Sequence, residues 1–282
     1  MHIKVNEPYL ASLNCAQFLC CAAILSMFNK LGSCLFFLLL VTVVLYGTKF
    51  AVYDQETRIT VAPVVNCRVI RILCFGDSLT SGFSTTTVEL HPYSTRLQEC
   101  FDFRCNNRTA MFGASLAWPI FEVHNAGMPG ERAKDQMCPR LSQILQRAIV
   151  KYSWVIILAG TNDMRNSRKD SSLSDSRAIF SALVKLHNIS HSFGAKTVAV
   201  SIPDRECEGS GTCSNLKATQ KKINALLRDF TSRNKENVIL ADLVREIFLP
   251  RDKRLWSDSL HFTREGYTKM ANIIYRSMKD HV

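Results

Sequence analysis

The stretch VIRILCFGDSLT, residues 69–80, joins a run of apolar residues directly to a short polar turn. Apolar residues occupy almost every position from Val69 to Phe75, so a strand formed here would be covered on both faces, as in a parallel sheet packed between helices. Gly76 then ends the run and allows a tight turn that exposes the hydroxyl of Ser78. The stretch therefore predicts a buried strand with a reactive serine at its carboxyl end.

Four more apolar runs of strand type follow, and segments with helical periodicity separate them. Strands that alternate with helices in this way are typical of a doubly wound α/β fold, with helices on both faces of a parallel sheet of about five strands. Asp175 and Thr263 are candidate N-caps. The predicted strands cover residues 69–75, 121–124, 154–159, 197–202 and 238–241, and the predicted helices cover residues 92–102, 131–150, 172–192, 214–234 and 263–279.

Polar motifs follow three of the predicted strands. Gly76-Asp77-Ser78 follows the first, Asn125-Ala126-Gly127 follows the second, and Gly160-Thr161-Asn162-Asp163 follows the third. Ligands of open α/β sheets bind outside the carboxyl ends of the strands. We therefore expect the three loops to converge on one edge of the sheet and to form a site there.

The chemistry of ester hydrolysis requires a nucleophile, a base, a group that orients the base, and donors for the oxyanion. Ser78 is the candidate nucleophile and His261 the candidate base. Asp258 precedes His261 by three residues, a spacing that lets the carboxylate reach the imidazole in a turn. The candidate oxyanion donors are the backbone N–H groups of Ser78 and Gly127 and the side-chain amide of Asn162.

Four short blocks of the sequence resemble the four blocks of the SGNH (GDSL) hydrolase superfamily. The blocks are Phe75–Thr80, Asn125–Gly127, Gly160–Asp163 and Asp258–His261, and they occur in the family's order. The resemblance covers about residues 69–279 and implies a three-layer, flavodoxin-like fold without a metal or another cofactor. It also implies roles in the catalytic triad and the oxyanion hole for Ser78, Gly127, Asn162, Asp258 and His261.

Other polar residues have a structural rather than a catalytic interpretation. Asp77 is expected to hold the nucleophile turn, and His124 is expected to be packed or hydrogen-bonded. His187 and His191 have a spacing that can bind metal, but no carboxylate or cysteine partner is evident, so we expect them on a solvated helix face. Trp256 has two interpretations, contact with the substrate or packing.

The N-terminal region holds much of the excess of apolar residues, and no charged residue occurs from Leu31 to Thr48. A membrane span needs about 20 apolar residues. We therefore predict that residues 31–49 form a signal-anchor helix, with the catalytic domain on the lumenal or extracellular side of the membrane. A cleaved signal peptide followed by secretion is an alternative, as is a helical hairpin that turns at Asn29-Lys30. The predicted parts are a tail (1–30), a transmembrane or signal-anchor segment (31–49), a stalk (50–66) and an SGNH hydrolase domain (67–282).

Cysteines and glycosylation sequons bear on the compartment. Two sequons, Asn107-Arg108-Thr109 and Asn188-Ile189-Ser190, fit a lumenal domain. The cysteine pairs 100/105 and 207/213 are each close enough in sequence for a disulfide, which would require an oxidising compartment. Buried reduced thiols are the alternative, and Cys74, inside a predicted strand, is expected to be one.

The net charge of +11 makes the chain basic. Basic domains favour anionic surfaces such as phospholipid headgroups, acidic glycans or nucleic acid. The basic residues are scattered, and no zinc-finger spacing or RNA-binding motif occurs, so no nucleic-acid partner is expected.

The leading functional hypothesis is serine-dependent hydrolysis of a carboxylic ester on a lipid, a lysophospholipid or an acetylated glycan. The reaction would pass through an acyl-enzyme intermediate. An acyltransferase would use the same triad, with an alcohol or a sugar in place of water. A non-catalytic binding protein on the same fold is a third hypothesis, against which the complete set of five site residues argues.

Overall fold

The computed structural model describes residues 68–112, 119–166, 172–206, 211–249 and 251–282. Every described residue belongs to the second of two units of the chain, Asn66–Val282. The predicted membrane segment at residues 31–49 and the stalk at residues 50–66 lie outside the described residues. Within the described ranges, no helix combines the length and the apolar character that a membrane crossing requires.

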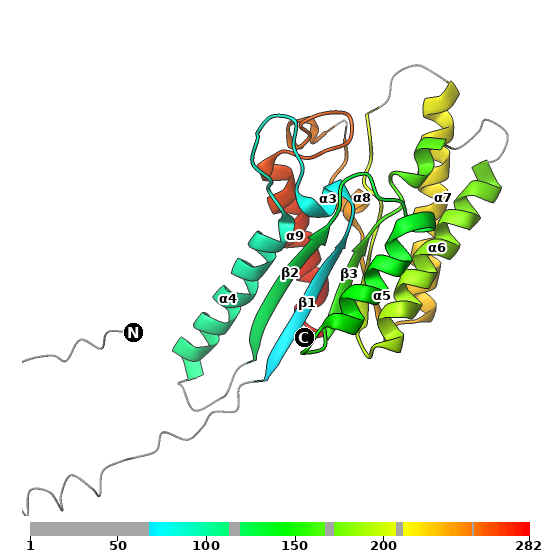
Figure 1. Cartoon of the computed structure of the whole chain (residues 1–282). Coiled ribbons are helices and arrows are strands. Elements are labelled where there is room, and N and C mark those ends of the chain that lie inside the picture. The colour runs from blue at the N-terminus through cyan, green and yellow to red at the C-terminus, as the bar shows by residue number, and fades with distance from the viewer. Residues whose placement is uncertain (1–67, 113–118, 167–171, 207–210, 250) are drawn as a thin grey trace, which may run out of the picture. The chain divides into compact units, whose positions relative to one another are not determined.

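The described residues of the second unit form a sheet of five parallel strands in the order β2-β1-β3-β4-β5. Figure 1 labels three of these strands, β2, β1 and β3. This order confirms the α/β prediction and places β1 at the switch point, because the chain runs to β2 on one side of β1 and to β3 on the other. The strands are β1 (Val69–Gly76), β2 (Ile120–Gly127), β3 (Trp154–Leu158), β4 (Lys196–Val200) and β5 (Val238–Ala241).

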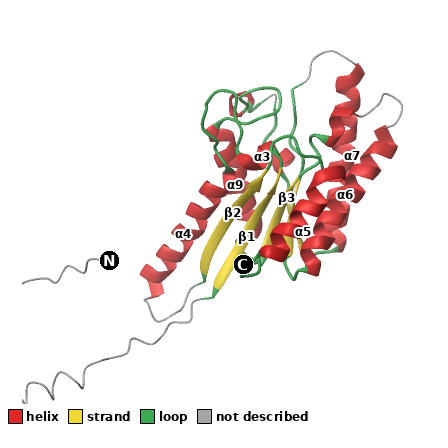
Figure 2. Ribbon diagram, viewed as in Figure 1, coloured by secondary structure: helices red, strands yellow, loops and turns green. Residues whose placement is uncertain are grey.

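Helices cover both faces of the sheet, as predicted (Figure 2). One face packs against α4 (Tyr93–Phe112) and α9 (Arg264–Met278), where Ile72, Leu97 and Ile274 belong to one buried cluster. The other face packs against α5 (Cys138–Arg147), α6 (Ser172–Ser192) and α7 (Gly211–Arg233), where Phe75 and Leu183 belong to a second cluster. Alternate residues of β1 enter different clusters, which explains why its sequence is apolar at nearly every position.

Several elements differ in extent from the prediction. Strand β2 continues through Asn125-Ala126-Gly127, which pair with residues 74–76 of β1, so this motif ends the strand instead of following it. A π-helical turn at Ala133–Met137 precedes α5, and α4 continues to Phe112. The short elements α3 (Ser78–Ser81), α8 (Leu243–Glu246), Asp163–Asn166 and Lys253–Leu255 were not predicted, because one turn is too short to show periodicity.

The cysteines at positions 100 and 105 do not form the disulfide considered from their spacing. Both lie in α4 outside any disulfide, and five residues of helix turn their side chains to different sides. The thiol of Cys100 donates to Oδ1 of Asn272, and that of Cys105 donates to the carbonyl of Pro119. Cys74 is a buried thiol, as predicted, and burial raises its pKa to about 12. Position 207 lies outside the described residues.

The expectation of a solvated face at His187 is wrong. The side chain of His187 is buried on α6, with Nδ1 2.7 Å from Oγ1 of Thr197 on β4. Nε2 of His191, one helical turn later, lies 3.1 Å from the same hydroxyl. His187 has the buried residues Leu183 and Ser190 as its helical neighbours, so it belongs to the face that packs on the sheet.

Candidate active site

The nucleophile turn begins where β1 ends at Gly76. Oδ1 of Asp77 accepts the N–H of Leu79 at 3.0 Å, and the backbone carbonyl of Asp77 accepts the N–H groups of Thr80 and Ser81. Asp77 therefore caps the short helix α3 and fixes Ser78 at its first position. The predicted structural role of Asp77 is confirmed by these contacts.

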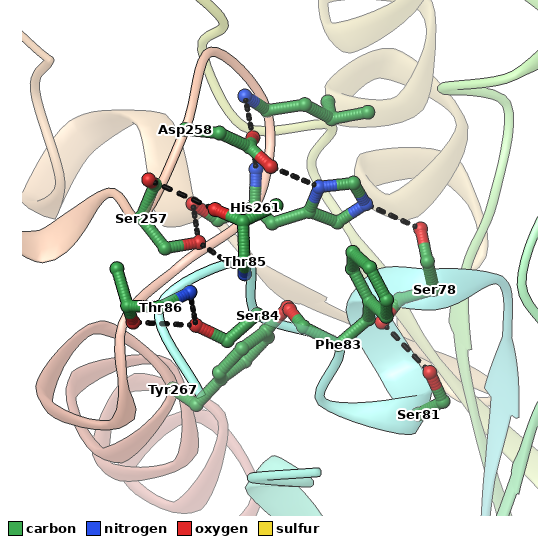
Figure 3. A network of polar contacts seen from close by, with 11 residues as sticks. Ser78, Ser81, Phe83, Ser84, Thr85, Thr86, Ser257, Asp258, His261 and Tyr267 are labelled. Atoms are coloured by element: carbon green, nitrogen blue, oxygen red, sulfur yellow. Dashed lines mark hydrogen bonds and ion pairs between the residues drawn. The ribbon is translucent and has the colours of Figure 1, made fainter. Parts of the chain in front are cut away.

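Three side chains that are distant in sequence form a continuous hydrogen-bonded chain (Figure 3). Nε2 of His261 lies 3.0 Å from Oγ of Ser78, and Nδ1 of His261 lies 2.8 Å from Oδ2 of Asp258. The side chains of His261 and Asp258 are 17% and 28% exposed, so both are largely shielded from water but not fully buried. The structure thus brings together the three residues that the sequence selected as nucleophile, base and orienting carboxylate.

A tight turn presents Asp258 and His261. Trp256 and Phe262 form an antiparallel bridge that closes the turn, and the carbonyl of His261 accepts the N–H of Ser257 at 2.8 Å. Within the turn, Oδ1 of Asp258 accepts the backbone N–H groups of residues 260 and 261, each at 2.7 Å. Partial burial raises the pKa of the Asp258 carboxyl, but its hydrogen bonds to His261 and residue 260 outweigh burial and leave the pKa below its ordinary value.

Trp256 and His124 pack against or bind other side chains of the protein. The ring of Trp256 is buried and packs against Phe262 with centroids 4.8 Å apart, so the packing interpretation holds. Nδ1 of His124 lies 2.8 Å from the hydroxyl of Tyr152, as expected for a hydrogen-bonded histidine.

The glycine predicted as an oxyanion donor already has a partner. The N–H of Gly127 donates to Oδ1 of Asn125 at 3.0 Å. A Cβ at position 127 would lie 2.1 Å from the backbone nitrogen of Ser81, so the missing side chain serves the packing of β2 against α3. These contacts argue against the predicted role of Gly127, whose close approach is to protein backbone and not to a substrate.

Gly130, three residues further on, has the properties expected of such a donor. Its φ of +82° lies in the left-handed region, and a Cβ there would meet no atom within 4 Å. Among the described residues, its N–H and that of Ser78 have no hydrogen-bond acceptor. The sequence contained a signal for this position, because the dipeptide Pro129-Gly130 marks a turn just beyond the strand.

Asn162 lies beyond the carboxyl end of β3 and is anchored to the loop that contains Gly130. Its Nδ2 donates to the carbonyl of Glu131 at 3.0 Å, which leaves the second N–H of the amide for another acceptor. The carboxylate of Asp163 accepts the N–H groups of Ala133 at 2.8 Å and Lys134 at 3.0 Å. The loops after β2 and β3 are therefore held to each other beyond the carboxyl ends of these strands.

Sequence reasoning missed Phe83 and Tyr267, which support the base. The ring of Phe83 meets the imidazole of His261 with centroids 4.7 Å apart and an interplanar angle of 67°. The hydroxyl of Tyr267 on α9 donates to the carbonyl of Phe83 at 2.5 Å (Figure 3). No sequence pattern links these positions, because their contact exists only after α9 packs beside the nucleophile turn.

A model of the GDSL-like lipase/acylhydrolase family matches residues 74–269, a range that contains every residue of this site. The chain belongs to this family. It is an ester hydrolase, and the resemblance noted in the four sequence blocks is confirmed. No curated protein matches the sequence significantly.

Solved structures of bacterial esterases share the fold. A member of the lipolytic G-D-S-L family from Veillonella parvula has a TM-score of 0.53 and 18% identity over 74% of this chain and 98% of its own. The carbohydrate acetylesterase Est24 from Sinorhizobium meliloti has a TM-score of 0.52 and 16% identity over 76% and 100% of the two chains. The esterase EstA from a Pseudoalteromonas species, inhibited by monoethylphosphonate, has a TM-score of 0.51 and 18% identity over 74% and 97%.

Proposed function

We propose that the protein hydrolyses carboxylic esters through an acyl-enzyme intermediate on Ser78, with His261 and Asp258 completing a catalytic triad. The observation that carries this proposal is the chain of hydrogen-bond distances from Oγ of Ser78 to His261 at 3.0 Å and from His261 to Asp258 at 2.8 Å. Family membership supports the reaction class, and this geometry supports the roles of the three residues.

In the first half of the reaction, Oγ of Ser78 attacks the acyl carbon while Nε2 of His261 removes the hydroxyl proton. The imidazolium then gives this proton to the departing alkoxide, and the acyl group remains on Ser78. In the second half, His261 takes a proton from water as the water attacks the acyl carbon. The imidazolium then returns this proton to Oγ of Ser78 as the bond between Oγ and the acyl carbon breaks, which releases the carboxylic acid and restores the free serine. Asp258 keeps the Nδ1–H tautomer in place and stabilises the imidazolium in both halves.

The negative charge that develops on the carbonyl oxygen needs donors in fixed positions. We assign the backbone N–H of Ser78, the side-chain amide of Asn162 and the backbone N–H of Gly130, with Gly130 taking the place first predicted for Gly127. The free N–H groups of Ser78 and Gly130 support this assignment. Removal of one such donor typically costs about 10²–10³-fold in kcat.

The test is the Ser78→Ala variant, which should lose both p-nitrophenyl acetate turnover and labelling by a fluorophosphonate while it keeps the wild-type circular dichroism spectrum. Ser81→Ala is the matched control, because Ser81 lies in the same short helix and its hydroxyl donates to the carbonyl of Ser78 at 3.0 Å. It should still incorporate one label per chain. Undiminished labelling of Ser78→Ala would overturn the proposal.

The substrate class is proposed as an acyl ester on a lipid, a lysophospholipid or an acetylated glycan. The structural neighbours include a lipolytic protein and a carbohydrate acetylesterase, which supports both kinds of substrate. A series of esters with increasing acyl length, assayed beside acetylated sugars, separates them by kcat/KM. The same assay with an added alcohol or sugar acceptor tests the acyltransferase alternative, in which acyl transfer to the acceptor would exceed hydrolysis.

A further inference from the structure

The guanidinium of Arg140 on α5 contacts three different acceptors near the carboxyl ends of β1 and β2. Nε lies 2.8 Å from both carboxylate oxygens of Glu131, and Nη2 lies 2.6 Å from one of them. Nη1 donates to the carbonyl of Ala126 at 2.9 Å, and Nη2 donates to that of Gly76 at 3.1 Å. The guanidinium also lies over the ring of Phe75, 4.2 Å from its centroid.

Each acceptor belongs to a segment that supplies a proposed oxyanion donor. Gly76 is two residues before Ser78, and Ala126 lies in the strand that leads to Gly130. Glu131 follows Gly130, and its backbone carbonyl accepts the amide of Asn162. Arg140 therefore holds the segments of Ser78 and Gly130 directly, and it holds the segment of Asn162 through Glu131.

The chemistry of arginine suits this task. The guanidinium is planar and has five N–H donors in a fixed fork, so it can hold several acceptors at defined angles, whereas the ammonium of lysine is a compact point charge. The side chains of Arg140 and Glu131 are only 19% and 12% exposed. A pair shielded to this degree is costly to disrupt, because the remaining charge loses its partner without regaining full hydration.

We propose that Arg140, with Glu131 as its counter-ion, is a positioning residue that fixes the distances between the oxyanion donors of Ser78, Gly130 and Asn162. This inference rests on the proposed function and deepens it, because it concerns the geometry of the same site. Arg140 has no contact with Ser78, His261 or Asp258 among the described residues, so its effect on the reaction passes through the backbone that it holds.

The experiment compares Arg140→Gln, Arg140→Lys and Glu131→Gln with Arg71→Gln as the matched control. Arg71 pairs with Glu122 and links the same two strands, β1 and β2, away from their carboxyl ends. Fluorophosphonate titration first counts the functional sites in each preparation, and kcat and KM are then expressed per labelled site. This correction separates misplaced donors from a loss of folded protein.

We expect Arg140→Gln to lower kcat per labelled site by about 10- to 100-fold, as small displacements of positioning groups do. KM should change little, because the donors act mainly in the transition state. Arg140→Lys should stay well below the wild type, and Glu131→Gln should show a smaller loss. Arg71→Gln should keep the wild-type kcat even if its melting temperature falls.

Three results would overturn the inference while the proposed function stands: an unchanged kcat per labelled site in Arg140→Gln, full restoration by Arg140→Lys, or an equal loss in Arg71→Gln. If Arg140→Gln does not fold, Glu131→Gln decides, since it keeps the backbone carbonyl and the shape of the side chain. A wild-type protein that takes no label on Ser78 would instead contradict the proposed function.

Discussion

The ring of Phe83 packs edge-to-face against the imidazole of His261, with ring centroids 4.7 Å apart. The backbone of Phe83 is fixed at both ends, because its N–H donates to the carbonyl of Ser78 at 3.1 Å and its carbonyl accepts the hydroxyl of Tyr267. A single residue thus connects the proposed nucleophile, the proposed base and α9. Phe83 is 37% exposed, so the residue lies at the surface beside His261.

Phe83→Leu should lower kcat, because leucine retains apolar bulk but loses the aromatic contact that holds the imidazole. Aromatic pairs of this kind are worth about 0.5–1.5 kcal/mol, which corresponds to a loss of up to about tenfold. Steady-state kinetics per labelled site measures the effect. Wild-type kcat in Phe83→Leu would show that the imidazole does not need this ring.

Tyr267→Phe tests whether the position of Phe83 beside His261 depends on the hydroxyl of Tyr267. The substitution keeps the buried ring and removes only the hydroxyl that donates to the carbonyl of Phe83. We expect a smaller fall in kcat than in Phe83→Leu, in the same direction. A larger fall than in Phe83→Leu would mean that Tyr267 acts by a route other than Phe83.

Asp258→Asn should reduce kcat strongly but less completely than Ser78→Ala. The amide can no longer favour the Nδ1–H tautomer or stabilise the imidazolium, a loss of about 10⁴-fold in comparable triads. Fluorophosphonate labelling should become slow without losing its final stoichiometry. A labelling rate equal to that of the wild type would exclude Asp258 as the orienting carboxylate.

Two buried groups make opposite contributions to stability as the pH changes. Burial raises the pKa of Asp77 from 3.8 to about 7, and Oδ2 of this carboxyl has no hydrogen-bond partner among the described residues. Burial lowers the pKa of His187 from 6.5 to about 3, and the neighbouring His191 lowers it further. Folding therefore retains a proton on Asp77 and excludes one from His187 over much the same pH range.

Asp77→Asn should make unfolding free energy rise with pH relative to the wild type. In the wild type, the contribution of Asp77 is fully present below the unfolded pKa of 3.8 and is lost as the pH rises through about 7. The loss is about 1.4 kcal/mol per pH unit within this window. Urea unfolding between about pH 4 and pH 7 should show a growing advantage of the variant. A constant difference would mean that Asp77 ionises normally in the folded state.

His187→Gln should have the opposite slope. The contribution of His187 is present above the unfolded pKa of 6.5 and is lost as the pH falls toward about 3. The variant has no group to protonate there, so its stability relative to the wild type should improve as the pH falls, whatever constant offset the substitution introduces. His191→Gln is the matched comparison, with a weaker slope because His191 is only partly buried. Parallel curves for His187→Gln and the wild type would contradict the assignment.

The membrane segment at residues 31–49 and the lumenal position of the catalytic domain stay predictions from the sequence, and we propose them as such. The full chain made in eukaryotic cells should remain with membranes after carbonate extraction, and deletion of residues 31–49 should release it. An N-glycanase should reduce its apparent mass, with Asn107→Gln and Asn188→Gln identifying the sequon. Asn188 is exposed on α6. Protein found in the medium would favour cleavage and secretion, and unglycosylated soluble protein would contradict both.

Local sequence was sufficient to predict much of the framework. The run from Val69 to Phe75 is apolar at nearly every position because β1 is buried on both faces, and a strand of this kind can be recognised without its neighbours. Ser78, Asp258 and His261 could also be selected from the sequence, because each lies in a short motif whose residue types and spacing suit ester hydrolysis. The end of β2 could not be predicted from the sequence, since the pairing of Asn125–Gly127 with β1 depends on a second strand.

The sequence by itself determined the fold class and selected Ser78, His261 and Asp258 as the proposed triad, because hydrophobic periodicity and short-range spacing are properties of neighbouring residues. Only the tertiary structure decided that Gly127 donates to Asn125, that His187 is buried against Thr197, and that Arg140 joins Gly76 of β1 to Ala126 and Glu131. The contacts of His187 and Arg140 join different elements of the fold, and the hydrogen bond from Gly127 to Asn125 forms where β2 pairs with β1. Such contacts depend on how helices and strands pack, and the residue types along one element do not specify which partner they will meet.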